Sequence, residues 1–301
     1  MRDKPFGFLQ TCDGIQLRYG FWPRRGDAHQ GTVLVLGGRT EFMEKYSETI
    51  GEINRRGFDA FSLDWRGQGL SDRMLADPTR GYIQSFTHYL ADLELFIDTI
   101  VRPNRRGLLV CMAHSMGANI ALHYLHKFPL GLDQGVLLSP MINICTDPVP
   151  HAMARWYCRI QVKLGRADRS LPSLRRYDSF RGSFDNNWLT HDPTRFFHVQ
   201  RLLQENPQLV VMGATYGWLA ASFAAMDTLR APGFAQRITT PLLVVTAGND
   251  RVVSNEAVRR FAAQLPAHET ICVQGAYHEI LQERDDLRDQ FWHAFDRFIQ
   301  R

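Results

Sequence analysis

The chain has 301 residues, of which 45% are hydrophobic and 22% charged, a composition typical of a globular protein that buries a large core. Its net charge is +4, and its basic residues occur in scattered pairs such as Arg55-Arg56 and Arg105-Arg106. We therefore expect no nucleic-acid partner, because no basic tract is present, whereas transient contact with a membrane surface fits the mild positive charge.

The five cysteines are odd in number and lack the spacings that hold zinc. We expect reduced thiols, and a disulfide between Cys145 and Cys158 is the alternative. The N-terminus lacks the apolar stretch of a signal peptide, and no apolar run reaches about 18 residues, the length that spans a membrane. These features predict a cytoplasmic protein, or one peripheral to the inner membrane, that uses no metal or other cofactor.

Short β-rich runs alternate with helix-like stretches along the first half of the chain. Strands are predicted at 31–36, 58–63, 108–113 and 135–139, and helices at 43–56, 84–101 and 116–127. Strands that alternate with helices in this way indicate a mostly parallel central sheet with helices on both faces.

The alternation stops at Pro140 and returns after Arg237. The later strands are predicted at 241–246 and 269–273, and the later helices at 254–264 and 285–300. We therefore predict a core made of residues 1–139 and 238–301, and a mainly helical cap, or lid, made of residues 140–237. An insertion at the C-terminal ends of parallel strands lies over the place where such sheets bind ligands.

The strand predicted at 108–113 runs directly into Ala113-His114-Ser115-Met116-Gly117, and a predicted helix follows. This is the G-x-S-x-G nucleophile elbow with alanine in place of the first glycine. Small residues flank the serine because its backbone is strained and the helix passes close to the strand. A plain tight turn would account for the motif alone, but the strand and helix around it favour Ser115 as a nucleophile.

A serine attacks carbonyl groups poorly unless a base takes its proton, and hydrolases with this elbow carry Ser, then Asp or Glu, then His along the chain. Asp250 and His278 each follow a predicted strand, so both belong to the sheet edge where Ser115 emerges. His278 is predicted as the general base and Asp250 as the residue that orients its imidazole. Asn249 and Glu279 are the rivals of Asp250, but Asn249 is neutral and Glu279 neighbours the histidine itself.

An oxyanion hole needs two N–H donors. Met116 is the first candidate, because it follows the nucleophile at the start of a helix. Arg39 is the second, because the preceding Gly37-Gly38 pair lets the backbone approach a substrate. A flexible turn is the alternative interpretation of the two glycines.

The segment 64–71, with its two glycines, has the composition of a tight loop. Asp64 and Arg66 are expected to brace this loop through hydrogen bonds. We assign it no part in catalysis.

Four segments of the chain together resemble the α/β-hydrolase superfamily. They are D-x-R-G-x-G-x-S at 64–71, the elbow at 113–117, G-N-D-x-V-V at 248–253 and the histidine after Gly275-Ala-Tyr. The chain is most similar to the branch of bacterial lysophospholipases and monoacylglycerol lipases, whose oxyanion loop matches Gly38-Arg-Thr-Glu41 followed by Lys45-Tyr46. Residues 213–218 look like the cap of the bacterial lysophospholipases. This resemblance covers essentially the whole chain and implies an α/β-hydrolase fold with an inserted cap.

Two positions depart from the pattern of that family. The usual His-Gly before the oxyanion residue is Gly37-Gly38 here, so a histidine that would brace the hole is missing. The elbow begins with Ala113 instead of glycine. Neither change removes a member of the triad, and both leave the level of activity open.

The predicted cap is rich in aromatic side chains, which can bind acyl chains through apolar contact alone. Tyr216 and Trp218 are the candidate substrate-binding residues, although most cap aromatics are expected to form the cap's own core. Arg155, Arg159 and Arg166 are candidates for attracting a phosphate headgroup, with exposed and solvated arginines as the alternative.

These features predict a serine hydrolase that cleaves a carboxylic ester through an acyl-enzyme. The expected substrate is a small-molecule or lipid ester, in particular a lysophospholipid or a monoacylglycerol. Two alternatives stay open, namely an aminopeptidase of the proline iminopeptidase type from the same superfamily and a catalytically weak ligand-binding homologue. The sequence leaves the acyl-chain length, the headgroup and the oligomeric state open.

Overall fold

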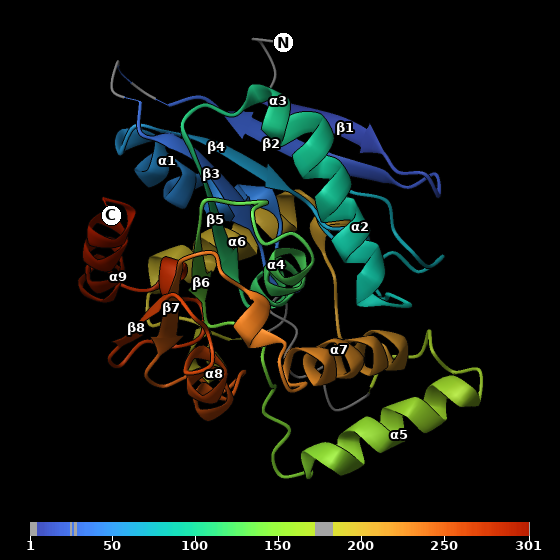
Figure 1. Ribbon diagram of the computed structural model, residues 1–301. Coiled ribbons are helices and arrows are strands. Elements are labelled where there is room, and N and C mark those ends of the chain that lie inside the picture. The colour runs from blue at the N-terminus through green and yellow to red at the C-terminus, as the bar shows by residue number, and fades with distance from the viewer. Residues whose placement is uncertain (1–4, 25, 27–28, 172–182, 301) are drawn as a thin grey trace.

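The computed structural model describes residues 5–24, 26, 29–171 and 183–300. Within this part of the chain, eight strands form one sheet in the order β1-β2-β4-β3-β5-β6-β7-β8 (Figure 1). The strands are β1 (Phe6–Gln10), β2 (Gln16–Trp22), β3 (Gly31–Leu36), β4 (Phe58–Leu63), β5 (Leu108–His114), β6 (Gln134–Leu138), β7 (Leu242–Ala247) and β8 (His268–Val273). From β4 across to β8 all neighbours are parallel, whereas β1 and β2 are antiparallel additions at one edge. This is the predicted mostly parallel α/β-hydrolase sheet.

The central strands are mostly apolar and are buried along their whole length because both faces of the sheet are covered. Every residue of β3, β4, β6 and β7 is buried. In β3, Leu34 and Leu36 point into one hydrophobic core, and Val33 and Val35 point into the other. Side chains alternate across a strand, so a strand with two buried faces favours apolar residues at successive positions.

Helices cover both faces of the sheet (Figure 1). On one face lie α2 (Phe86–Phe96), α4 (Met116–Lys127) and α8 (Asn255–Ala262), and on the other lie α1 (Ser47–Arg55) and α9 (Asp285–Ile299). The helix predicted at 84–101 is α-helical only to Phe96. It continues as a π-helical turn at Ile97–Val101 and a last short turn, α3 (Arg102–Asn104).

The strands β1 and β2 are absent from the predicted elements. Both are short and contain a glycine against which an aromatic ring packs. A Cβ atom added to Gly7 would lie 2.5 Å from the ring of Tyr19, and one added to Gly20 would lie 2.3 Å from the ring of Trp22. These glycines interrupt the apolar pattern of the two strands, so the sequence pattern does not predict them. The packing of the Tyr19 and Trp22 rings over the glycines is visible only in the structure.

Between β6 and β7 the described residues form three α-helices, α5 (His151–Lys163), α6 (Pro193–Glu205) and α7 (Tyr216–Leu229). We call residues 140–237 the cap. The helix α7 is buried along most of its length and packs on α4 and α2. The helix α5 packs on α7 and lies on its far side from the sheet (Figure 1). Asp192 and Thr215 cap α6 and α7 by accepting backbone N–H bonds.

The segment 64–71 forms the braced loop that the sequence predicts. The Asp64 carboxylate accepts the backbone N–H groups of Met43 at 3.0 Å and Leu70 at 2.9 Å. The buried Arg66 guanidinium donates two bonds of 2.6 Å to Asp92 on α2. These contacts tie the loop to elements before and after it, which confirms its structural role.

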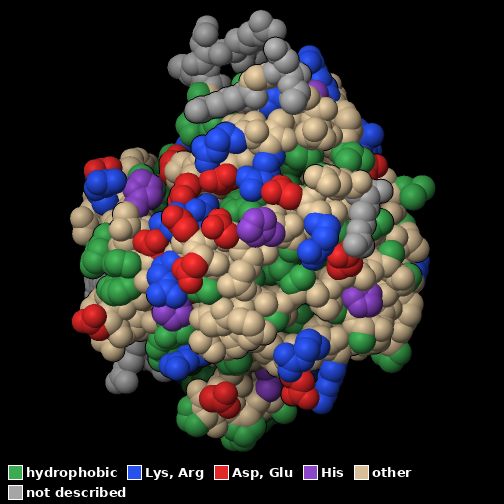
Figure 2. Space-filling model, turned by 90° about the vertical axis from the view of Figure 1, so that its left-hand side faces the viewer, with side chains coloured by type: hydrophobic (Ala, Val, Ile, Leu, Met, Phe, Trp, Pro, Cys, Tyr) green, Lys and Arg blue, Asp and Glu red, His purple; other side chains and the backbone are tan. Residues whose placement is uncertain are grey.

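Charges on the surface are mixed in sign. Figure 2 shows acidic and basic side chains next to one another on one face of the molecule. Ion pairs of the protein include Arg195–Glu48 and Arg56–Asp296. All five cysteines are free, so Cys145 and Cys158 form no disulfide. Among the described helices, none has the length and apolar character needed to cross a membrane.

The buried pair Arg66–Asp92 generates a stability prediction. Asp92→Ala leaves Arg66 buried with only the half-exposed Asp13 as partner, so we expect a loss of about 3–5 kcal/mol in the free energy of unfolding. The matched control is Asp77→Ala, which removes an exposed ion pair with Arg80 and should cost less than about 1 kcal/mol. Urea unfolding measures both values, and equal losses in the two variants would contradict the prediction.

Candidate active site

Ser115 lies at the sharp turn between β5 and α4, with φ 51° and ψ −111°. A non-glycine residue in this left-handed region is strained. The helix leaves the turn beside the end of β3, since a Cβ atom at Gly117 would come within 2.5 Å of the Leu36 carbonyl oxygen. The Ser115 N–H donates to the Leu138 carbonyl at 3.0 Å. The strained turn is therefore held by strands on both sides and has the geometry of a nucleophile elbow.

Ala113 occupies the position where the family pattern has glycine. It lies opposite Leu36 on β3 and Leu137 on β6 and is completely buried. Its methyl group belongs to the hydrophobic core on the α4 face of the sheet. The structure therefore accommodates alanine at the start of the elbow without displacing a neighbouring strand.

The structure brings Ser115, Asp250 and His278 together at the C-terminal edge of the sheet. The distance from His278 Nε2 to Ser115 Oγ is 3.0 Å, and the distance from His278 Nδ1 to Asp250 Oδ2 is 2.8 Å. A carboxylate can only accept, so the Nδ1–H donates to Asp250, and Nε2 accepts from the serine hydroxyl. This arrangement allows the imidazole to remove the serine proton during attack on a carbonyl carbon.

Asp250 is fixed in the position that this role requires. Its second oxygen, Oδ1, accepts the N–H groups of Val252 at 2.8 Å and Val253 at 3.0 Å. Burial alone would raise the pKa of Asp250, but the charge of His278 and its hydrogen bond lower it below the ordinary value. The two alternatives to Asp250 have other partners. Asn249 donates to the Gly275 carbonyl, and Glu279 pairs with Lys45 at 2.6 Å.

The loop after β3 lies directly against the nucleophile. A Cβ atom at Gly38 would lie 3.2 Å from Ser115 Cβ, so a larger residue there would be in tight contact with the nucleophile. The Gly38 N–H donates to the Glu41 carboxylate, and the Thr40 N–H donates to Gln68 Oε1 at 2.9 Å. Arg39, the predicted oxyanion residue, lies between these two fixed amides. Met116, the other predicted donor, is the first residue of α4, where N–H groups have no partner within the helix.

A buried ionic network lies beneath this loop, and no catalytic role was predicted for its members. Lys45 Nζ lies 2.8 Å from Glu41 Oε1 and 2.6 Å from Glu279 Oε1. His114 Nδ1 lies 3.1 Å from Glu41 Oε2, and its Nε2 lies 3.2 Å from the carbonyl oxygen of His278. The network therefore connects the oxyanion loop to the backbone of His278.

The charges of this network balance. Both partners of the His114 ring are acceptors, so both ring nitrogens donate and the ring is cationic. Burial would lower the pKa of His114, but the charge of Glu41 and its hydrogen bond raise it above the ordinary value. Burial would raise the pKa of Glu41, but Lys45 and His114 hold it well below the ordinary value. Two cations, Lys45 and His114, therefore face two carboxylates, Glu41 and Glu279.

The structure separates the two predicted cap residues. Trp218 is buried, its ring lies 6.0 Å from the Phe86 ring, and the Arg39 guanidinium lies 5.1 Å above it. Trp218 is therefore next to the oxyanion loop. Tyr216 is also buried, but its ring lies against Tyr157 of α5, at 5.7 Å between ring centres.

The cap arginines have acidic or polar partners that the sequence did not reveal. Arg155 donates two bonds of 2.8 and 3.0 Å to the Asp227 carboxylate, and Arg159 lies 3.6 Å from the same group. Arg166 donates to Gln161 Oε1 at 3.2 Å. Asp227 therefore pairs with two of the three arginines that were candidates for binding a phosphate.

A cleft opens between the oxyanion loop, the start of α6 and the residues that follow His278, and no member of the triad is part of its lining. Its lining is apolar on the α6 side and polar where it meets Lys45 and Glu279. The lining residues are Thr40, Phe42, Lys45, Leu189, Thr190, Arg195, Phe196, Val199, Gln200, Leu203, Glu279 and Gln282. Within the described part of the chain, no group of three or more His, Cys, Asp or Glu side chains is placed to hold a metal ion.

Comparison with known families identifies relatives along nearly the whole chain. Residues 27–285 match the family described as serine aminopeptidase, S33. Lysophospholipase L2 of Escherichia coli strain K12 is 34% identical over 295 residues, which cover 92% of this chain and 82% of that protein. A probable lysophospholipase L2 of Haemophilus influenzae is 27% identical over 296 residues, which cover 98% of this chain and 92% of that protein.

Solved structures agree on the fold. A soluble variant of monoglyceride lipase from Saccharomyces cerevisiae, in complex with a substrate analogue, superposes with a TM-score of 0.76. The superposition covers 98% of this chain and 95% of that chain, at 18% sequence identity. At this identity the likeness establishes the α/β-hydrolase fold.

The buried network generates a prediction about stability and its pH dependence. Glu41→Gln removes the charge that Lys45 and His114 share, so we expect the free energy of unfolding to fall by about 3 kcal/mol. The contribution of Glu41 to the free energy of unfolding is present above the pKa of 4.5 that this group has in the unfolded chain, and it is lost as the pH falls. The contribution of His114 is present below its unfolded pKa of 6.5 and is lost as the pH rises through its raised folded pKa.

The difference between wild type and Glu41→Gln should therefore be largest between pH 4.5 and 6.5 and should shrink on either side of this window. Chemical unfolding across this pH range measures it. A difference that is constant with pH would contradict the paired charges.

Proposed function

The chain belongs to the serine aminopeptidase S33 family of α/β-hydrolases and is a carboxylic ester hydrolase, and we propose that it cleaves single-chain lipid esters, a lysophospholipid or a monoacylglycerol. The observation that carries this proposal is the hydrogen-bonded chain from Ser115 through His278 to Asp250. The two lysophospholipase relatives, which match at least nine-tenths of this chain, support the lipid substrate.

In the proposed reaction, His278 takes the proton of Ser115 while the serine oxygen attacks the ester carbonyl carbon. The N–H groups of Arg39 and Met116 stabilise the oxyanion that forms. His278 then gives its proton to the leaving alcohol, and Asp250 stabilises the imidazolium in between. A water molecule hydrolyses the acyl-enzyme by the same steps, with His278 again acting as the base.

The proposed acyl site uses the cap. The apolar side of the cleft, with Phe196, Val199 and Leu203 of α6, suits an acyl chain, since it offers contact area without polar demands. Trp218 lies next to Arg39 and is the better-placed of the two predicted substrate-binding residues, while Tyr216 supports the cap from within.

The aminopeptidase is the weaker alternative. The family description names it, and an ester and a peptide can be cleaved by the same triad. The relative that is 34% identical is named a lysophospholipase, which favours the ester. A panel of p-nitrophenyl esters and amino-acid p-nitroanilides separates these two functions.

We further propose that α5 contacts a lipid surface. Four large apolar side chains at helical spacing face solvent along α5 and its end, namely Met153 at 61% exposure, Trp156 at 65%, Tyr157 at 42% and Leu164 at 59%. The exposed basic residues Arg159 and Lys163 flank this stripe. An apolar stripe with tryptophan and basic flanks is typical of a helix that lies in the interface of an anionic membrane. Such contact fits a protein peripheral to the cytoplasmic face of the inner membrane.

The nucleophile generates the central prediction. Ser115→Ala should lower turnover of a monoacylglycerol roughly 10⁴–10⁶-fold and abolish labelling by a fluorophosphonate probe. The matched control is Ser139→Ala. Ser139 directly follows β6 with φ 42°, and its buried hydroxyl has no hydrogen-bond partner among the described residues. Near-normal hydrolysis by Ser115→Ala would overturn the mechanism, and an unlabelled wild type would favour a ligand-binding homologue.

The exposed stripe of α5 generates a second prediction. Replacing both Met153 and Trp156 by alanine should weaken binding to phosphatidylglycerol vesicles about 10-fold or more, because each side chain loses apolar contact with the lipid. Hydrolysis of soluble p-nitrophenyl butyrate should be unchanged. Phe197→Ala on α6, which removes a side chain of 58% exposure outside the stripe, is the control. Vesicle co-sedimentation measures binding, and equal binding by all three proteins would refute the contact.

A further inference from the structure

The loop that carries His278 is held by the cap as well as by the core. We call residues 277–283, between β8 and α9, the histidine loop, and residues 189–195 the cap contact segment. The Glu279 N–H donates to the Leu189 carbonyl at 2.9 Å. The Thr190 hydroxyl donates to the Gln282 carbonyl at 2.6 Å. These bonds join distant parts of the chain, since Thr190 and Gln282 are 92 residues apart in the sequence.

A single buried carboxylate stands at the centre of this contact. The side chain of Glu283 is completely buried. Its Oε1 accepts the N–H of Tyr277 at 2.7 Å and lies 2.8 Å from His191 Nδ1, and its Oε2 accepts the N–H of His191 at 2.9 Å. The His191 ring also stacks on the Tyr277 ring, with 3.8 Å between centres. Glu283 therefore bridges a cap residue and the residue directly before His278.

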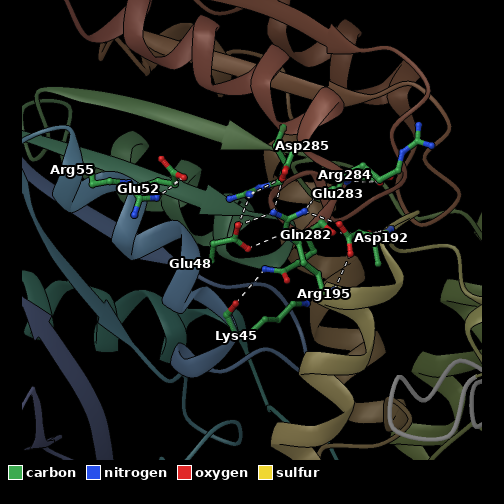
Figure 3. A network of polar contacts seen from close by, with 12 residues as sticks. Lys45, Glu48, Glu52, Arg55, Asp192, Arg195, Gln282, Glu283, Arg284 and Asp285 are labelled. Carbon is green, nitrogen blue, oxygen red and sulfur yellow. Dashed lines mark hydrogen bonds and ion pairs between the residues drawn. The ribbon is translucent and has the colours of Figure 1, made fainter.

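The cap contact segment is itself fixed to the core. Arg195 Nη1 donates to the Glu283 carbonyl at 2.9 Å, and its other nitrogens reach Glu48 on α1 and Asp285 on α9 (Figure 3). The hydrogen bond from Arg195 and the charge of Arg288 lower the pKa of Glu48 to about 2. These ion pairs consequently persist at any pH where an enzyme of this kind would work.

We propose that Glu283 is a positioning residue for His278, and that His191 of the cap completes its hydrogen bonds. This inference rests on the proposed role of His278 as general base. A buried carboxylate that loses its donors is left without hydrogen-bond partners and without water, which is unfavourable, so Glu283 follows His191 when the cap moves. Because Glu283 also holds Tyr277, a shift of the cap moves the backbone at His278.

The consequence is that the cap sets the geometry of catalysis in addition to covering the substrate. A displacement of about 1 Å at the reacting groups can lower the rate about 100-fold. Movement of α6 on substrate entry would therefore change the geometry of the hydrogen bond between His278 and Ser115. If the cap contact segment served only to attach the cap, its loss would affect the binding of long acyl chains and leave chemistry on a short ester intact.

The test uses p-nitrophenyl acetate, whose acyl group is too short to need the cap. His191→Ala should lower kcat about 10-fold while KM changes less than about 2-fold, because the base is misplaced and the small substrate still enters. His191→Asn places an amide N–H near the position of Nδ1, so it should restore kcat to within about 2-fold of wild type. His198→Ala is the matched control, since His198 lies on α6 and contacts Arg201 instead of the histidine loop.

Three results would overturn the inference. They are an unchanged kcat in His191→Ala, a loss that appears only in KM for long-chain esters, and a loss that His191→Asn does not restore. Glu283→Gln should show a larger loss of kcat than His191→Ala, and thermal unfolding shows whether each variant is folded. Ser115→Ala in the same assay separates the two proposals. If Ser115→Ala is active, the proposed mechanism is wrong. If Ser115→Ala is inactive and His191→Ala has normal activity, only the positioning role of Glu283 is wrong.

Discussion

The strained backbone of Ser115 is the constraint on which the site depends. A residue at φ 51° between a buried strand and a helix keeps this conformation only if its surroundings leave no alternative. Gly117 lets α4 pass against the end of β3, and Gly38 lets the next loop approach the nucleophile from the other side. The hydrogen bond from Ser115 to Leu138 adds the neighbouring strand. The parallel sheet therefore provides a rigid edge on which a serine can be held in an unfavourable conformation.

The second requirement is a base whose position does not drift. His278 is held at its ring by Asp250, at its carbonyl by His114 and through its neighbours by Lys45 and Glu283. Each of these contacts is a charged group with little exposure to solvent. Charges are costly to bury, and each of these has a hydrogen-bond or ion-pair partner. Glu41, Lys45 and His114 also hold the oxyanion loop.

The cap has two faces with different chemistry. Its inner side packs on α4 and α2 through α7 and holds the histidine loop through the segment that leads into α6. Its outer helix, α5, turns apolar side chains toward solvent, while Arg155 and Arg159, two of the arginines considered for phosphate binding, are paired with Asp227. A lipid that leaves a membrane would meet α5 first, and its ester would then react at a triad whose base is in contact with the same cap. The proposed substrate and the proposed coupling are therefore parts of one arrangement.

The sequence by itself determined the parallel core, the cap between β6 and β7, and the three residues that meet at the sheet edge. It could do so because strands buried on both faces are mostly apolar and because the triad residues follow predicted strands in the chain order typical of the elbow. Only the tertiary structure decided the partners of Glu41, His114, His191 and Glu283, and which arginines Asp227 neutralises. These contacts join side chains from distant segments, and no local period or spacing encodes which acceptor a buried donor will find. The hairpin of β1 and β2 belongs to the same class, since ring packing over its glycines, and not an apolar pattern, stabilises it.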